Sequence, residues 1–221
     1  MPSLDWEIKV GFPRAGVAGV DEVGRGCLAG PVVAAAVLLP EIVDVSVCPW
    51  LEKVTDSKML SPEDRERLAP LITGWAASSA VGYATVEEID RINIFHASHL
   101  AMQRAIEGLK IAPAHVLVDG KFKPKFFHGE AVAGARTLCE STAIIKGDLL
   151  CLSIAAASIV AKVWRDQRMA ELDTAYPGYD FGTHKGYSTP AHSAALKKLG
   201  ACEIHRKSFA PVAATLQDRL F

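Results

Sequence analysis

One short stretch near the N-terminus constrains the fold more than any other part of the sequence. Residues 17–20 (Val-Ala-Gly-Val) run directly into two carboxylates, Asp21 and Glu22, and then into Gly24-Arg25-Gly26. The apolar run is too short and too punctuated for a helix, so it predicts a buried strand. Burying two carboxylates at the end of such a strand costs free energy unless something offsets their charge. A hard divalent cation, which binds oxygen ligands, is the simplest partner.

Two further predicted strands also lead into carboxylates. Residues 115–118 are apolar and precede Asp119, and residues 142–146 lead through a glycine to Asp148. Sites in open α/β sheets gather at strand ends, so neighbouring strands would bring these side chains to Asp21 and Glu22. Four like charges cannot all stay ionised at one site without cations. The pattern therefore favours a metal site over the ordinary alternative, a solvated acidic turn.

The rest of the pattern predicts an α/β fold. Residues 31–39 form a second apolar strand that folds back on the first as a hairpin. Residues 75–85 predict another strand, residues 153–169 a helix, and residues 120–140 a long connection with three lysines. Strands that alternate with helices after a hairpin indicate a mixed sheet with helices on its faces. A chain of 221 residues is expected to form a single domain, here with a helical part from about residue 176.

Local signals mark where the helices begin. Ser, Thr and Asn cap helix N-termini, Pro favours the first helical position, and Ser/Thr followed three residues later by Glu forms a capping box. These signals occur at Ser61 with Pro62, at Thr85 with Glu88, at Asn93, and at Thr189 with Pro190. Gly200 is expected to close the last of these helices.

The glycine-rich segment has one competing interpretation. Residues 24–29 match the dinucleotide-binding fingerprint G-x-G-x-x-G/A. That fingerprint needs a helix to receive the pyrophosphate, whereas Pro31 and a run of Val, Ala and Leu follow here. Asp21 and Glu22 would also repel a pyrophosphate. The glycines are better interpreted as a turn whose backbone N–H groups approach a sugar or phosphate closely.

Composition limits the class of protein. The formal net charge is −1, so a polyanion would have to bind through local basic patches. The five cysteines form no Cys-x-x-Cys pair, which indicates neither a disulfide framework nor a zinc site. The N-terminus lacks the features of a signal peptide, and the longest apolar run is too short to span a bilayer. We therefore expect a cytoplasmic protein that does not bind membranes.

At these residues the sequence resembles the bacterial ribonuclease HII family (type 2 ribonuclease H). The matching motifs span roughly residues 17–209 in the family's order, so chance agreement is very unlikely. They are residues 19–26 (Gly-Val-Asp-Glu-Val-Gly-Arg-Gly), 28–32 (Leu-Ala-Gly-Pro-Val), 55–58 (Thr-Asp-Ser-Lys), 90–94, 118–120 (Val-Asp-Gly), 146–148 (Lys-Gly-Asp), 153–166, 184–189 (His-Lys-Gly-Tyr-Ser-Thr) and 205–209 (His-Arg-Lys-Ser-Phe).

The resemblance implies a ribonuclease H-like fold, a five-stranded mixed sheet flanked by helices, with residues of about 176–221 as a C-terminal helical part that helps bind substrate. It implies a monomeric endonuclease that cuts the RNA strand of RNA–DNA hybrids. It also implies incision on the 5′ side of single ribonucleotides in duplex DNA, leaving 3′-hydroxyl and 5′-phosphate ends. Two Mg²⁺ or Mn²⁺ ions would act in a two-metal mechanism.

The resemblance also assigns roles to individual residues. The metal-binding and catalytic carboxylates would be Asp21, Glu22, Asp119 and Asp148. The residues expected to bind substrate are Gly24, Arg25 and Gly26, which match the turn that reads the 2′-hydroxyl; Tyr187, which matches the tyrosine that packs on the sugar; and Lys58, Asn93 and Arg165, which match positions that hold the substrate backbone.

The sequence departs from the family's pattern at two points. Cys27 stands where proline is common, and the interval from Asp119 to Asp148 is longer than in compact bacterial members, which leaves the path of residues 120–140 open. Two other functions remain alternatives. One is a ribonuclease HIII-type enzyme, whose extra N-terminal domain the 20 residues before Asp21 do not provide. The other is a hybrid-binding module without catalysis, which the four carboxylates argue against.

Overall fold

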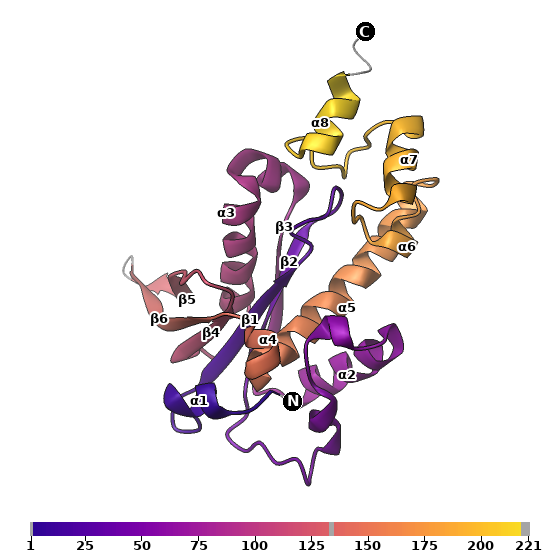
Figure 1. The fold of residues 1–221 in the computed structure, drawn as a ribbon. Coiled ribbons are helices and arrows are strands. Elements are labelled where there is room, and N and C mark those ends of the chain that lie inside the picture. Colours follow the sequence, from indigo (N-terminus) through magenta and orange to yellow (C-terminus); the bar gives the residue numbers. More distant parts are fainter. Residues whose placement is uncertain (1, 133–134, 218–221) are drawn as a thin grey trace.

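The computed structural model describes residues 2–132 and 135–217 and has a mixed sheet between two long helices (Figure 1). The order of the six strands in the sheet is β3-β2-β1-β4-β6-β5. The strands are β1 (Val17–Val23), β2 (Val32–Leu38), β3 (Ser78–Ala84), β4 (His115–Asp119), β5 (Phe126–Val132) and β6 (Ala135–Ile144). Helix α3 (Val86–Glu107) covers one face and α5 (Leu152–Ala175) the other (Figure 1).

The opening hairpin and the mixed sheet are confirmed. β1 pairs antiparallel with β2 and parallel with β4, and β4 in turn pairs parallel with β6. β3 lies antiparallel to β2 at one edge of the sheet, and β5 lies antiparallel to β6 at the other. The parallel strands β1, β4 and β6 therefore bring their carboxyl ends to one edge, as the sequence predicts.

The sheet has six strands where the resemblance implies five, because residues 120–140 are not a plain connection. They contain β5 and the first part of β6. Phe126 is fully buried in the core under α3, which holds β5 against the sheet. The side chain of Gln103 on α3 donates to the carbonyl of Phe127 and accepts from its N–H, at 2.6 and 3.1 Å. A side chain thus satisfies both backbone groups of Phe127 on this edge strand.

Helix α5 lies unusually close to the central strand. A Cβ built on Gly19 of β1 would stand 2.2 Å from the carbonyl carbon of Ser153 and 2.3 Å from the amide nitrogen of Ile154. Only glycine permits this approach between backbones. Small residues of α5, Ala155 to Ala157, continue the close packing on this face. The helix and the strand therefore hold the end of β1 in a rigid setting.

The predicted helix starts are confirmed. Ser61 caps α2 (Pro62–Trp75), Thr85 and Glu88 form a capping box at the start of α3, and Thr189 caps α7 (Pro190–Leu199), which Gly200 closes. Asn93 divides α3 in two: its φ of 63° interrupts the helix. The Asn93 Oδ1 atom then accepts from the amides of Phe95 and His96 at 3.0 and 3.3 Å, a cap for the second part.

Short elements complete the chain. They are α1 (Asp5–Lys9), the 3₁₀ turns η1 (Pro49–Lys53) and η2 (Ser57–Met59), α4 (Gly147–Leu150), α6 (Phe181–His184) and α8 (Ala210–Gln217). Helices α7 and α8 follow α5 in the chain and lie beyond its end, at the top of Figure 1. No helix within the described ranges is both long and apolar enough to cross a bilayer.

Candidate active site at the end of the central strands

The four predicted carboxylates meet where two parallel strands separate. The pairing of β1 with β4 ends at Val20 and Val118, while β1 continues beside β2 as far as Val23. Asp21 and Glu22 lie just beyond this split, and Asp119 is the last residue of β4. Asp148 lies in α4, which follows β6. The charges of Glu22, Asp119 and Asp148 all raise the pKa of Asp21, and that of Asp119 raises the pKa of Asp148.

Asp21 and Glu22 do not point the same way. β1 keeps a regular register with β2 through both residues, without a break or a bulge between them. Side chains alternate along a strand, so Asp21 shares the α5 face with Gly19, and Glu22 points toward α3. The two carboxylates therefore approach the site from opposite faces of the sheet.

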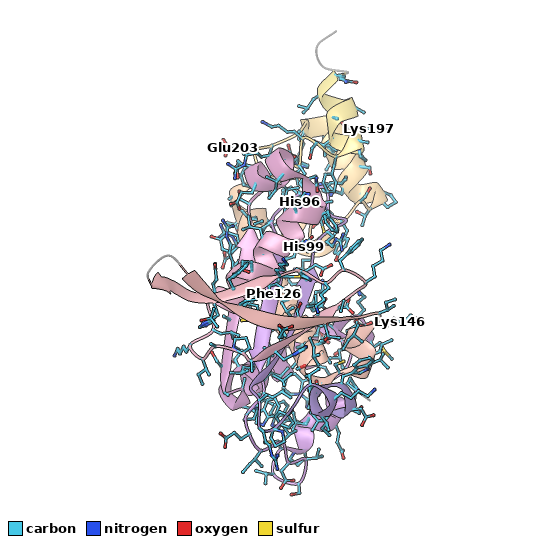
Figure 2. All side chains as sticks on the ribbon, turned by 90° about the vertical axis from the view of Figure 1, so that its left-hand side faces the viewer. His96, His99, Phe126, Lys146, Lys197 and Glu203 are labelled. Carbon is cyan, nitrogen blue, oxygen red and sulfur yellow. The ribbon has the colours of Figure 1, made fainter. Side chains whose placement is uncertain are left out.

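Asp119 joins the end of β4 to the start of α4. Its Oδ1 atom accepts a hydrogen bond from the Gly147 N–H at 2.8 Å. Lys146, which stands at the far end of β6 in Figure 2, has a φ of 59° and turns the chain from the strand into α4. This turn places Asp148 in the first turn of the helix, where it is buried.

Asp21, Glu22 and Asp148 have raised pKa values and are protonated more easily than ordinary carboxylates. Burial raises the pKa of Asp21 well above its usual value, and the charges of Glu22, Asp119 and Asp148 raise it further. Burial is the main cause of the raised pKa of Asp148, and the charge of Asp119 is the next largest. Burial also raises the pKa of Glu22, although Arg25 opposes the shift through a salt bridge of 3.1 Å. Burial is the largest cause of each of the three shifts, and the charges of neighbouring carboxylates add to it.

Lys58, like Arg25, is a cation that interacts electrostatically with the carboxylates. Partial burial lowers its pKa, but the charges of Asp56, Asp21, Asp148 and Asp119 outweigh this and raise it. Asp56 accepts from the Lys58 N–H at 2.9 Å. The amide of Ser57 binds the Ser158 hydroxyl of α5 at 3.2 Å, so η2 is fixed beside the site. Lys58 and Arg25 are too few to neutralise four carboxylates.

The donor set fits hard divalent cations, because every candidate ligand is an oxygen and the charge excess is negative. Within residues 2–132 and 135–217, no three Asp, Glu, His or Cys side chains are already gathered as one ligand set. A cavity of about 380 Å³ opens beside Glu22 and Asp119, and it is also lined by Arg25, His99 and Phe122. His99 is half-buried, and its ring lies edge-on to that of Phe95, with 4.4 Å between the ring centroids.

The glycine turn lies directly after the two carboxylates. Gly24 has a φ of 91°, and a Cβ built on it would stand 2.2 Å from Nε of Arg165. Gly26 is exposed, and a Cβ built on it would meet nothing within 4 Å. The Cys27 N–H donates to the Gly24 carbonyl at 3.4 Å, which closes the turn. Gly24 is thus required by the protein's own packing, whereas Gly26 faces open space.

Arg165 does not lie where the sequence prediction puts it. It was expected to hold the substrate backbone, but its side chain is fully buried. Its guanidinium donates to the carbonyls of Lys185, Pro31 and Ala29 at 2.8, 3.2 and 3.3 Å. These bonds use its donors inside the protein, so Arg165 supports the turn from below. Lys58 and Asn93, by contrast, are exposed.

Tyr187 lies at the margin of the same turn. It is 38% exposed, and its ring lies 5.7 Å from both the Arg165 guanidinium carbon and Lys162 Nζ. The Tyr187 carbonyl contacts His192 Nδ1 at 2.9 Å. Burial raises the pKa of the Tyr187 hydroxyl, and Cys27 beneath the turn adds to the shift. A planar, half-exposed ring therefore stands beside the exposed side of the turn.

Sequence reasoning missed the importance of Arg206. Within residues 205–209, His205 and Arg206 are buried, whereas Lys207 and Ser208 are exposed. Arg206 is fully buried, and it donates to the carbonyls of Gly24, Arg25 and Gly30 at 2.7, 2.8 and 3.0 Å. The only available signal was the motif match at these residues, since nothing local predicts a partner so far away in the chain.

Comparisons with known proteins agree with this geometry. The family model described as ribonuclease HII matches residues 18–212. A ribonuclease HII of Nitrosococcus oceani is 54% identical over 197 residues, 89% of each chain. Another, of Parvibaculum lavamentivorans, is 50% identical over 222 residues, 100% of this chain and 76% of that one.

A solved structure shows the same fold. The ribonuclease H2 of Pyrococcus horikoshii has a TM-score of 0.71 at 28% identity, covering 91% of this chain and 97% of that chain. The family model spans the strands that carry Asp21, Glu22 and Asp119, and it extends through Arg206. The chain therefore belongs to the ribonuclease HII family, and it is a ribonuclease H enzyme with the ribonuclease H-like α/β fold.

Proposed function

We propose that this protein is a divalent-metal-dependent endonuclease that cuts the RNA strand of RNA–DNA hybrids and incises 5′ of single ribonucleotides in duplex DNA. One observation carries the proposal: Asp21, Glu22, Asp119 and Asp148 follow neighbouring strands at the edge where β1 and β4 separate, and a turn with Gly26 exposed follows two of them directly. The first feature suits phosphodiester hydrolysis, and the second suits recognition of a sugar. Their adjacency places the two tasks on one stretch of backbone.

The ligands of the metal would be Asp21, Glu22, Asp119 and Asp148. Bound Mg²⁺ or Mn²⁺ supplies an activated water for attack on the phosphorus and stabilises negative charge on the leaving 3′-oxygen. The protein holds its carboxylates ready for this task. The Gly147 N–H orients Asp119, and the Glu22 N–H orients Asp21 at 2.7 Å. Such bonds leave the other carboxylate oxygens available as ligands.

The remaining exposed residues would hold the nucleic acid. Lys58 stands beside the carboxylates with its pKa raised by them, so it stays charged and can contact a phosphate. Asn93 uses its Oδ1 atom as a helix cap, which leaves its exposed amide NH₂ for a backbone contact. Tyr187 would pack on the sugar at the RNA–DNA junction.

The turn of residues 24–26 would identify the ribose. The 2′-hydroxyl is the group that distinguishes RNA from DNA at a given position. A backbone N–H can reach it only where no side chain intervenes, and no atom lies within 4 Å of the place where a Gly26 Cβ would stand. Cleavage on the 5′ side with 3′-hydroxyl and 5′-phosphate products completes the proposal.

The test is a cleavage assay on an end-labelled DNA duplex that contains one ribonucleotide, with the all-deoxy duplex of the same sequence as control. In Mg²⁺ or Mn²⁺ we expect one cut, 5′ of the ribonucleotide, and none in the control. Excess EDTA should stop the reaction, and added Mg²⁺ should restore it. Cleavage that persists in EDTA, or equal cutting of both duplexes, would overturn the proposal.

A further inference from the structure

Arg206 is a buried cation with an unusual set of partners. The side chain is fully buried, and its guanidinium donates to three backbone carbonyls, those of Gly24, Arg25 and Gly30. Its planar face also lies 5.1 Å from the ring of Phe209. No carboxylate among the described residues forms a salt bridge with it. Burial lowers the pKa of Arg206 to about 10, so the group is still a cation at neutral pH.

Two of these bonds determine which way the turn faces. In a trans peptide the carbonyl and the N–H point in opposite directions across one plane. Arg206 binds the carbonyls of Gly24 and Arg25 from inside the protein. The N–H groups of Arg25 and Gly26, which belong to the same two peptide planes, must therefore point outward. Neither N–H donates to any described group of the protein.

The same bonds make these outward N–H groups better donors. A cation that binds a carbonyl oxygen polarises the whole peptide group, and linked hydrogen bonds strengthen one another. The chain that follows the turn is held by both arginines. Arg206 binds the Gly30 carbonyl, and Arg165 binds the carbonyls of Ala29 and Pro31. The turn thus rests on two buried guanidinium groups, of which only Arg206 binds residues of the turn itself.

We propose that Arg206 is a positioning residue for ribose selection: it holds the carbonyls of Gly24 and Arg25 inward, so that two adjacent backbone N–H groups face the 2′-hydroxyl of the substrate. This inference rests on the proposed function, because it explains how the turn of residues 24–26 would recognise a ribonucleotide. A lysine at position 206 keeps the charge but lacks the planar fork that binds both carbonyls at once.

The test compares Arg206→Lys with Arg104→Lys, a matched change at a guanidinium far from the turn. Arg104 also binds a carbonyl, that of Tyr83 at 2.7 Å, together with Glu88 at 2.7 Å. For each enzyme in Mg²⁺ we measure kcat and KM on the single-ribonucleotide duplex and the inhibition constant of the matching all-deoxy duplex. The ratio of that inhibition constant to KM reports the preference for ribose.

We expect Arg206→Lys to raise KM roughly tenfold, which is what losing one or two well-placed hydrogen bonds amounts to. The inhibition constant of the all-deoxy duplex should stay the same, because its phosphates are bound elsewhere. Arg104→Lys should leave the ratio unchanged. An unchanged ratio in folded Arg206→Lys would overturn this inference alone, whereas a wild-type enzyme without any preference for ribose would overturn the proposed function.

A second measurement needs no variant, in case Arg206→Lys does not fold. Amide hydrogen exchange in the wild-type protein, with EDTA present so that neither duplex is cut, follows the N–H groups of Arg25 and Gly26 directly. We expect both to exchange fast in the free protein, and to slow at least tenfold with the single-ribonucleotide duplex but not with the all-deoxy one. Protection in the free protein, or equal slowing by both duplexes, would contradict the proposed orientation.

Discussion

The two glycines of the turn should respond to the same substitution in opposite ways. Gly24→Ala places a Cβ 2.2 Å from Nε of Arg165 on a backbone with a φ of 91°. The left-handed conformation alone costs an L-residue about 1–2 kcal/mol. Arg165 cannot move aside without loosening its bonds to three carbonyls, each worth about 1 kcal/mol. We therefore expect a loss of about 3 kcal/mol in the free energy of unfolding, or roughly 10 °C in Tm.

Gly26→Ala should leave the fold intact and damage the reaction. Its Cβ would meet nothing within 4 Å, and Gly26 is not among the glycines with positive φ. Replacing glycine at such a position restricts the unfolded chain and stabilises a protein by about 0.4–1 kcal/mol. The same methyl group would occupy the space through which the sugar approaches. We expect kcat/KM on a single-ribonucleotide duplex to fall roughly a hundredfold, which corresponds to about 2.7 kcal/mol.

The two assays are a thermal melt and steady-state cleavage, run on both variants at the same pH and salt. Gly26→Ala should melt no lower than the wild-type protein and cut poorly, and Gly24→Ala should melt clearly lower. Wild-type cleavage by Gly26→Ala would refute the idea that the open face of the turn receives the sugar. A large loss of Tm in Gly26→Ala would refute the geometry on which the comparison rests.

Three other changes test the site and its support. Asp21→Asn should abolish cleavage in a gel assay. In a thermal melt at pH 7 its Tm should stay the same or rise, because the change removes one carboxylate from a group whose pKa values are raised. Near-normal cleavage would contradict the assignment of Asp21 as a metal ligand. Tyr187→Ala should reduce cutting at a lone ribonucleotide more than in a long hybrid, with Tyr187→Phe as control; equal losses on both substrates argue against a junction role. His205 is buried, and burial is the main reason that its pKa is lowered to about 4. Below about pH 6.5 the unfolded chain therefore binds more protons than the folded protein, and stability should decrease as the pH falls. This contribution amounts to roughly 2 kcal/mol between pH 7 and 5, and urea unfolding of wild type and His205→Asn should show the steeper decline in wild type; parallel curves would contradict it.

Much of the framework follows from local chemistry. The caps at Thr85 and Asn93 form because their side-chain oxygens bind amides two or three residues away, a range that a sequence pattern covers. β1 and β4 are apolar runs that end in carboxylates, and parallel strands place such ends together. The sequence pattern alone therefore places these carboxylates at one edge of the sheet.

Other features could not be predicted because they depend on distant contacts. β5 lacks a clear alternation, since His128 and Gly129 interrupt its apolar residues, and its place in the sheet depends on pairing with β6, on the core under α3 and on the side chain of Gln103. The opposite directions of Asp21 and Glu22 depend on how far β2 continues beside β1. The burial of an arginine such as Arg206 is harder still to predict, because a charged side chain is ordinarily exposed to solvent.

The contact between Arg206 and the turn also determines the order in which the site is completed. The bond to the Gly24 carbonyl joins residues 182 positions apart, nearly the full length of the chain. Asp21, Glu22, Asp119 and Asp148 all precede it in synthesis, so the acidic edge of the sheet can assemble while the C-terminal part is still being made. Closing so long a loop is a late event in folding, since its entropy cost must be met before its contacts stabilise anything. If the proposed function is correct, the turn that would select the sugar is therefore completed after the carboxylates that would hold the metal.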